Sequence, residues 1–147
     1  FSWLAGRFDT VSGHFTFDPA TVPQGQSITV EIDPASVDTN FAERDKHLRS
    51  ERFLDTDKYP KASFVSSGYT GDAKGGILKG ILTLHGVSKP IEIKVAKVGE
   101  GKDPWGGYRA GFEGSFLLTR SDFGVSYDLG PSAQTMEMSL YVEGIRQ

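Results

Sequence analysis

The residues most able to do chemistry crowd into one short segment, 42–55, which reads AERDKHLRSERFLD. If this segment is helical, Glu43, His47 and Glu51 lie four residues apart on one face, as an acid–base pair or a metal site would require. The same spacing also produces a solvated face of ion pairs. We favour the solvated face, because the segment holds one histidine and the chain shows no second ligand cluster with matching spacing. An enzyme that uses His47 and Glu51 as acid and base is the alternative.

The other two histidines show no catalytic context. His14 falls on the polar face of an alternating segment and His85 ends another, so each is expected to be an exposed or hydrogen-bonded structural residue. No GxSxG segment marks a nucleophilic serine, and the GxG patterns lack the strand-to-helix context of a phosphate-binding loop. The sequence therefore predicts no catalytic residues and no metal site.

Length and composition indicate a single domain spanning residues 1–147. A chain of this size can bury one continuous core without disulfides, and it contains no cysteine. The formal net charge of -3 and the sequence pI of about 5.6 produce a field that repels phosphate backbones, so nucleic acid is not an expected partner. No apolar run approaches the roughly 20 residues of a membrane-spanning helix.

Most of the chain alternates apolar and polar residues with a period of two, which is typical of strands that bury one face. Short connections rich in glycine and proline separate these segments and favour an antiparallel up-and-down order. Glycines within the segments would let the sheet curl. We predict an all-β, closed or nearly closed barrel with strands at 8–17, 26–33, 61–69, 76–85, 91–98, 107–119 and 136–144.

The one long connection, 34–60, is expected to contain a helix of about three turns over 41–54. Asn40 and Glu43 have the spacing of an N-terminal capping box, and the segment is rich in helix-forming residues. Such a helix could lay its apolar side chains over one mouth of the barrel while its charged face remains in water. The apolar side chains concerned are Phe41, Leu48, Phe53 and Leu54.

Three longer motifs, in this order, carry a resemblance to a known family. They are SVDTNFAERDKHLRSERFLDTDKYPKASFVS (36–66), GILTLHGVSKPIEIKV (80–95) and DPWGGYRAGFEGSFLLTRSDFGV (103–125). In sequence and in order they resemble the YceI-like family of bacterial lipid-binding proteins, and the resemblance covers essentially the whole chain. It implies an extended, lipocalin-like barrel that holds a long isoprenoid or similar lipid, such as an isoprenyl phosphate or a quinone-like molecule.

The resemblance carries further expectations. It implies no cofactor, export to the periplasm, and about eight strands, the first of them upstream of the segment Gly6 to Phe8. Storage or transport of the lipid would bring transient contact with a membrane, for which Trp105 in the tight loop GKDPWGG is a candidate. An enzyme acting on the lipid and a barrel with a filled core that serves as an interaction module are the alternatives.

Strand parity predicts the side chains that line the apolar channel. They are Phe15, Phe17, Ile28, Val30, Ile32, Phe64, Leu82, Leu84, Phe112, Phe116, Met136, Met138 and Leu140. Arg44, His47 and Arg49 are candidates to meet the head group of the ligand at the edge of the helix. Ion pairing with neighbouring carboxylates is the simpler expectation for these three residues.

Overall fold

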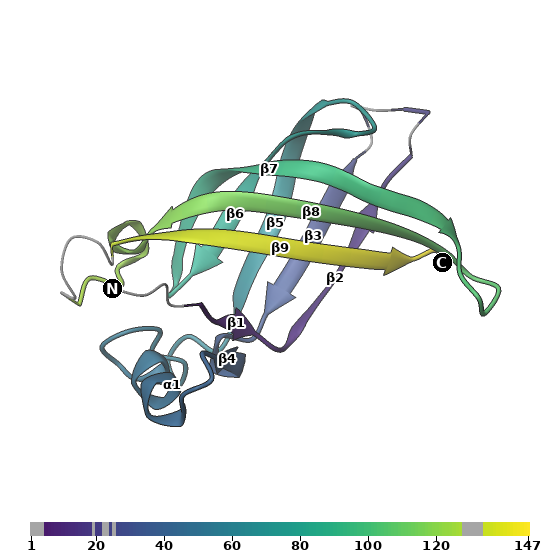
Figure 1. The fold of residues 1–147 in the computed structure, drawn as a ribbon. Helices are drawn as coiled ribbons and strands as arrows, with labels where there is room; N and C mark the ends of the chain where they lie inside the picture. The colour runs from purple at the N-terminus through teal and green to yellow at the C-terminus, as the bar shows by residue number, and fades with distance from the viewer. Residues whose placement is uncertain (1–4, 19, 22–23, 25, 128–133) are drawn as a thin grey trace.

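Seven antiparallel strands form one sheet that curls into a nearly closed barrel, in a computed structural model that describes residues 5–18, 20–21, 24, 26–127 and 134–147 (Figure 1). Each strand pairs with the next one along the sheet, in the order β2-β3-β5-β6-β7-β8-β9. The strands are β2 (Val11–Thr16), β3 (Ser27–Ile32), β5 (Ala62–Gly71), β6 (Gly75–Leu84), β7 (Val87–Lys102), β8 (Tyr108–Thr119) and β9 (Thr135–Ile145). The predicted all-β antiparallel barrel with one helix is confirmed.

A short two-stranded sheet outside the barrel was not predicted. It pairs β1 (Arg7–Phe8) with β4 (Val37–Asp38), which follows a single 3-10 turn, η1 (Pro34–Ser36). The expected strand 8–17 is divided because Asp9 and Thr10 turn toward this sheet: the backbone N–H of Asp9 donates to the Ser36 carbonyl (3.1 Å). The barrel sheet thus has seven described strands, and the eighth, upstream strand stays a prediction.

The helix α1 (Ala42–Arg49) is shorter than predicted and begins differently. Asn40 adopts a left-handed conformation (φ 63°) and does not cap it; the N-cap is Phe41, which makes no side-chain hydrogen bond. The helix ends at Arg49, so the prediction of a helix reaching residue 54 is wrong. No helix among the described residues is long and apolar enough to cross a membrane.

The buried core lies on the inner face of the barrel. The strand register places residues of three neighbouring strands side by side on this face. Phe64 of β5 lies opposite Val30 of β3 on one side and opposite Leu82 of β6 on the other. The buried members of this core are Val30, Phe64, Leu82, Ile93, Leu118 and Phe123. Phe123 comes from a 3-10 turn, η2 (Arg120–Phe123), that follows β8 and closes the core at the end of the barrel nearer α1 (Figure 1).

Replacing Phe64 by alanine tests this register, with its neighbour Val65 as the matched control. Phe64 is 5% exposed, so Phe64→Ala should lower the free energy of unfolding by about 3–5 kcal/mol through lost burial and the cavity left behind. Val65 points outward and is 49% exposed, so Val65→Ala should cost less than about 1 kcal/mol. Urea denaturation measures both, and equal losses would contradict the assigned faces.

Candidate functional site

The channel side chains predicted from strand parity lie on the inner face. Besides the buried core, the residues packed against it include Ile28, Ile32, Leu84, Phe116, Met138 and Leu140. Met136 shares this face, opposite Leu118, but is 46% exposed because β9 is an edge strand. Their role in contacting a ligand stays a prediction.

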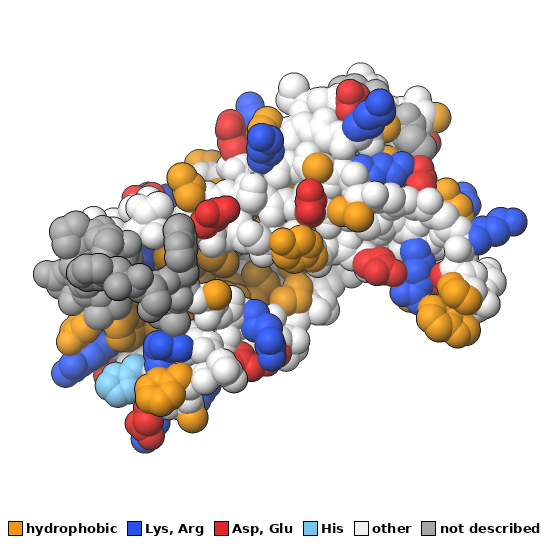
Figure 2. Space-filling model, in the orientation of Figure 1, with side chains coloured by type: hydrophobic (Ala, Val, Ile, Leu, Met, Phe, Trp, Pro, Cys, Tyr) orange, Lys and Arg blue, Asp and Glu red, His pale blue; other side chains and the backbone are white. Residues whose placement is uncertain are grey.

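The inner face is apolar but incompletely buried. Among the described residues no large side chain is fully buried, and the accessible surface is 10038 Å². Figure 2 shows hydrophobic side chains in a recess below the front strand, between it and the region of β1 and α1. Several apolar side chains of the inner face, among them Phe116, Met138 and Leu140, are therefore only partly buried.

Aromatic side chains gather at the end of the channel opposite α1. The ring of Phe112 on β8 makes edge-to-face contacts with Phe15 on β2 (5.5 Å between centroids) and with Phe17 just beyond it (5.0 Å). The ring of Phe15 also lies directly against Gly144 of β9, where a Cβ atom would clash with it. Side-chain packing thus joins the two edge strands, β2 and β9.

Beside these rings lies a polar cluster that we did not anticipate. Lys97 is opposite Phe112 in the register, on the inner face, and its ammonium group lies 5.0 Å from the centre of the Phe17 ring. It forms an ion pair with Glu100, which also accepts a hydrogen bond from the Tyr108 hydroxyl (3.1 Å). The side chains of Lys97 and Glu100 are 17% and 28% exposed. An inward polar cluster at one end of an apolar channel is suited to hold the polar end of an amphiphile.

The protonation states of this cluster follow from its hydrogen bonds. Lys97, and then Tyr108, hold the pKa of the Glu100 carboxyl below its usual value by donating to its charged form. The same bond raises the pKa of Tyr108, mainly because its hydroxyl donates to Glu100. Both shifts favour a carboxylate at Glu100 and a neutral hydroxyl at Tyr108 near neutral pH. The ammonium retains donors for a further acceptor.

The inward position of Lys97 could have been predicted from the sequence. The inward positions Ile91, Ile93 and Val95 extend by the same parity to residue 97. Glu100 could not have been placed in this way, because a bulge between Lys97 and Gly99 shifts the register before Glu100. Parity alone would have assigned Glu100 to the outer face.

The predicted head-group residue Arg44 is engaged in a structural contact at the base of α1. Its guanidinium donates to the hydroxyl (2.8 Å) and carbonyl (2.7 Å) of Thr39 and lies over the ring of Phe41. The buried Asp45 accepts from the Thr39 backbone N–H (2.9 Å) and from its hydroxyl. The hydroxyl is the main reason that the pKa of Asp45 is lowered. These contacts tie α1 to the end of β4.

The remaining residues of the charged segment do not form one site. Glu51 lies beyond the end of α1, so the predicted helical stripe with Glu43 and His47 does not form; all three are exposed. Arg49 is half-buried near Asp45, whose pKa it helps to lower. Contact of His47 and Arg49 with a head group stays a prediction.

The apolar side chains of the crossover differ in their burial. Phe41, the N-cap of α1, is 58% exposed with Arg44 over its ring, and its predicted place over the mouth of the barrel stays a prediction. Leu48 and Leu54 are half-buried, and Phe53 is buried with its ring 5.3 Å from that of Tyr127.

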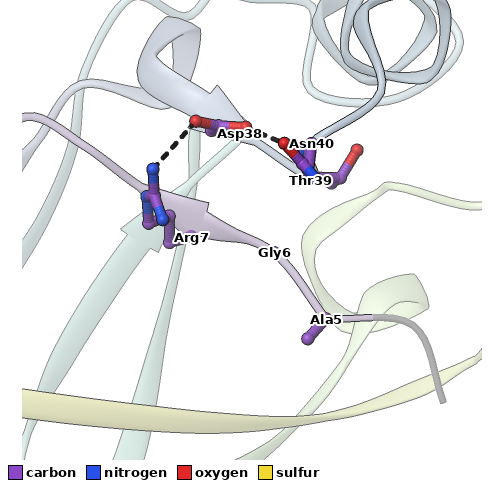
Figure 3. Close-up of a pocket in the computed structure, with 6 residues that line it drawn as sticks. All are labelled: Ala5, Gly6, Arg7, Asp38, Thr39 and Asn40. Atoms are coloured by element: carbon purple, nitrogen blue, oxygen red, sulfur yellow. Dashed lines mark hydrogen bonds and ion pairs between the residues drawn. The ribbon is translucent and has the colours of Figure 1, made fainter.

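A shallow cleft of about 240 Å³ lies between β1 and β4 (Figure 3). Arg7 reaches across toward Asp38 (3.2 Å), and the Asn40 backbone N–H donates to the other oxygen of that carboxylate (2.9 Å). The cleft holds no pairing of nucleophile and base. It is lined by Ala5, Gly6, Arg7, Asp38, Thr39 and Asn40.

The other histidines occupy structural or exposed positions. His14 is exposed on β2. His85 forms the turn between β6 and β7, where its Nδ1 lies 3.1 Å from the Phe123 carbonyl and its ring packs on Tyr59. Within the described part of the chain, no three His, Asp or Glu side chains converge as metal ligands.

Comparison with known proteins gives a consistent result. The YceI-like domain matches residues 1–143. A UPF0312 protein of Pseudomonas aeruginosa is 52% identical over 147 residues, which is 100% of this chain and 76% of that protein. The crystal structure of a Campylobacter jejuni YceI protein superimposes with a TM-score of 0.91 at 30% identity, covering 100% of this chain and 87% of that one.

A more distant structure shares the fold. It is a polyisoprenoid-binding domain from Saccharophagus degradans, with a TM-score of 0.57 at 21% identity, covering 83% of this chain and 68% of that one. Since the domain match spans nearly the whole chain and a relative is about half identical along all of it, this chain belongs to the YceI-like domain family.

Proposed function

We propose that this protein binds a long-chain amphiphilic lipid, without catalysis, in the channel of its barrel. The observation that carries this proposal is the apolar inner face that remains partly exposed. Apolar surface left in contact with water is unfavourable by roughly 25 cal/mol per Å². Binding of a ligand of matching shape would bury this surface and so be favourable. In a barrel with a filled core, the same surface would already be buried on folding, and none would remain for a ligand.

The dimensions of the channel suit an extended hydrocarbon. The strand β7 runs over Val87–Lys102, and at about 3.3 Å per residue such a strand is far longer than a compact core requires. Each buried CH₂ group contributes about 0.8 kcal/mol, so a chain of fifteen carbons or more would contribute on the order of 10 kcal/mol before ordering costs. Tight binding then needs few polar contacts.

The ligand class that we propose is an isoprenoid, such as an isoprenyl phosphate or a quinone-like molecule. The fold shared with the polyisoprenoid-binding domain of Saccharophagus degradans agrees with this class. Storage or transport in the periplasm is the corresponding biological role, because the YceI-like resemblance implies export. Delivery to or from a bilayer would require transient contact with a membrane.

For the polar end of the ligand we propose the cluster of Lys97, Glu100 and Tyr108. Both oxygens of Glu100 are engaged within the cluster, whereas the ammonium of Lys97 retains donors. The cluster therefore favours a hydrogen-bond acceptor, such as a phosphate or a carbonyl oxygen. We propose this cluster in preference to Arg44, whose guanidinium is already bonded to Thr39.

Gentle purification should recover the protein with lipid bound. Mass spectrometry of an organic extract should detect one dominant long-chain amphiphile at close to one molecule per protein. Removing the lipid should lower the melting temperature, because a ligand that binds the folded state stabilises it. If the extract holds no amphiphile and the purified protein takes up no farnesyl phosphate, the proposal is wrong and the filled-core reading stands.

The double variant His47→Ala, Glu51→Ala tests the alternative hypothesis that the protein is an enzyme with these two residues as acid and base. We expect the wild-type protein to leave the mass of the extracted lipid unchanged on long incubation. The double variant should carry as much of the lipid as the wild type, since both side chains are exposed and lie off the inner face. A lipid product formed by the wild type and absent with the variant would instead establish catalysis.

The proposed polar end is tested with Lys97→Met, and Lys94→Met is the control. Lys94 lies three residues earlier on the same strand, but it is exposed. Lys97→Met should weaken farnesyl phosphate binding about tenfold or more, because hydrogen bonds to charged groups contribute about 1.5–3 kcal/mol. Isothermal titration calorimetry measures the change. Equal affinities for the two variants, with wild-type melting temperatures, would show that the head group is held elsewhere.

A further inference from the structure

The loop between β7 and β8 projects a single aromatic side chain into solvent. Trp105 is 81% exposed, more than Tyr141 at 79% or Leu117 at 71%. An aromatic ring gains more from burial than most side chains, so its full exposure at a loop tip leaves that free energy available to a partner. Figure 1 places this loop at the end of the barrel opposite α1, close to the C-terminus.

A turn stabilised by side-chain hydrogen bonds holds Trp105 in this position. The Asp103 side chain is only 8% exposed, and its Oδ1 accepts from the backbone N–H groups of Trp105 (2.9 Å) and Gly107 (2.8 Å). Gly106 adopts φ 88°, a conformation that a side chain would strain. The tip is therefore organised before any partner arrives, which lowers the entropic cost of docking.

Arg109 fastens the tip to the outer face of the sheet. Its Nε donates to Asp103 (2.8 Å), its Nη1 donates to Glu143 of β9 (3.0 Å), and its guanidinium lies 5.5 Å from the centre of the Trp105 ring. The two carboxylates outnumber the single charge of Arg109, so this group of three side chains carries a formal charge of -1. The indole keeps most of its surface in water despite this contact.

Cationic side chains flank the tip. Lys102 ends β7 and Arg146 follows β9; both are exposed, and neither forms an ion pair with another described residue. Arg146 lies over the Tyr108 ring (5.6 Å), and Ile145 beside it is 53% exposed. Figure 2 shows a projecting hydrophobic group at this end, with Lys or Arg and also Asp or Glu side chains beside it. Counted with Arg109, Asp103 and Glu143, these two cations give the tip a formal net charge of +1, whereas the whole chain carries -3.

The chemistry of this tip matches a lipid surface. Tryptophan concentrates at the membrane–water interface, where its ring is apolar and its N–H meets the head groups. Each nearby Lys or Arg adds about 1 kcal/mol of attraction to an anionic leaflet. A stable protein interface buries about 800 Å² on each partner and has few lysines at its centre. A single exposed ring between two cations offers neither that area nor an uncharged centre.

We propose that the β7–β8 tip docks on an anionic membrane surface, with Trp105 entering the interface and Lys102 and Arg146 facing the lipid head groups. Docking in this orientation brings the channel end that carries Phe112 and Lys97 to the bilayer. The inference concerns the rim at this end of the barrel and does not depend on which lipid the barrel holds.

Vesicle flotation tests this inference, with liposomes of phosphatidylcholine alone or mixed with phosphatidylglycerol. The wild-type protein should bind the mixed vesicles more strongly, and added salt should weaken binding. Trp105→Ala should lower the partition coefficient about tenfold, as expected for loss of an aromatic anchor. Tyr141→Ala, which removes an equally exposed ring from the middle of β9, should change it less than about twofold.

The cationic contribution is measured with the double variant Lys102→Ala, Arg146→Ala. This variant should lose binding to the mixed vesicles and bind phosphatidylcholine vesicles as the wild type does. Melting temperatures close to that of the wild type confirm that all variants fold. Absence of wild-type binding, or equal losses for Trp105→Ala and Tyr141→Ala, would overturn the proposal. The vesicles contain no isoprenoid, so failure of the lipid-binding proposal would leave this result unchanged.

Discussion

The structure depends on the way in which the two edges of one sheet meet. Hydrogen bonds fix the register of every neighbouring pair from β2 to β9, whereas Phe15 of β2 lies against Gly144 of β9 through side-chain packing. The barrel is therefore closed at this point by side-chain packing and not by a hydrogen-bonded ladder. The distance between two strands can vary more when side-chain packing alone joins them than when backbone hydrogen bonds join them, because hydrogen bonds require a narrow range of distances.

The two ends of the barrel are built differently. At the end nearer α1, Phe123 of η2 and the core residues Phe64 and Leu118 pack together. Arg120 of the same turn is buried and donates to the carbonyls of Val125 (3.3 Å) and Tyr127 (3.2 Å). At the opposite end the inner face becomes aromatic and then polar. A lipid with one polar end would be oriented by this difference.

The charged segment that looked most like an active site is structural in its described contacts. Asp45 and Arg44 both bond to Thr39, which fixes α1 against β4. Placing this ionised carboxylate in a partly buried position requires the two donors that Thr39 provides. The polar groups on the inner face, by contrast, were the ones that sequence inspection passed over. Charge density along the chain is therefore a poor guide to the position of the polar site.

Strand alternation by itself determined the fold class and the facing of most apolar side chains. A period of two is a local property of the backbone, so the sides occupied by Val30, Phe64 and Leu82 could be read directly. Only the tertiary structure decided the features that depend on distant partners. The bulge at Lys97 brings Glu100 to the inner face, the left-handed Asn40 replaces the expected cap, and Thr39 and Asp45 define where α1 begins. Each of these rests on a contact or a backbone conformation that no residue pattern encodes, because several local solutions are nearly equal in energy and long-range packing selects one.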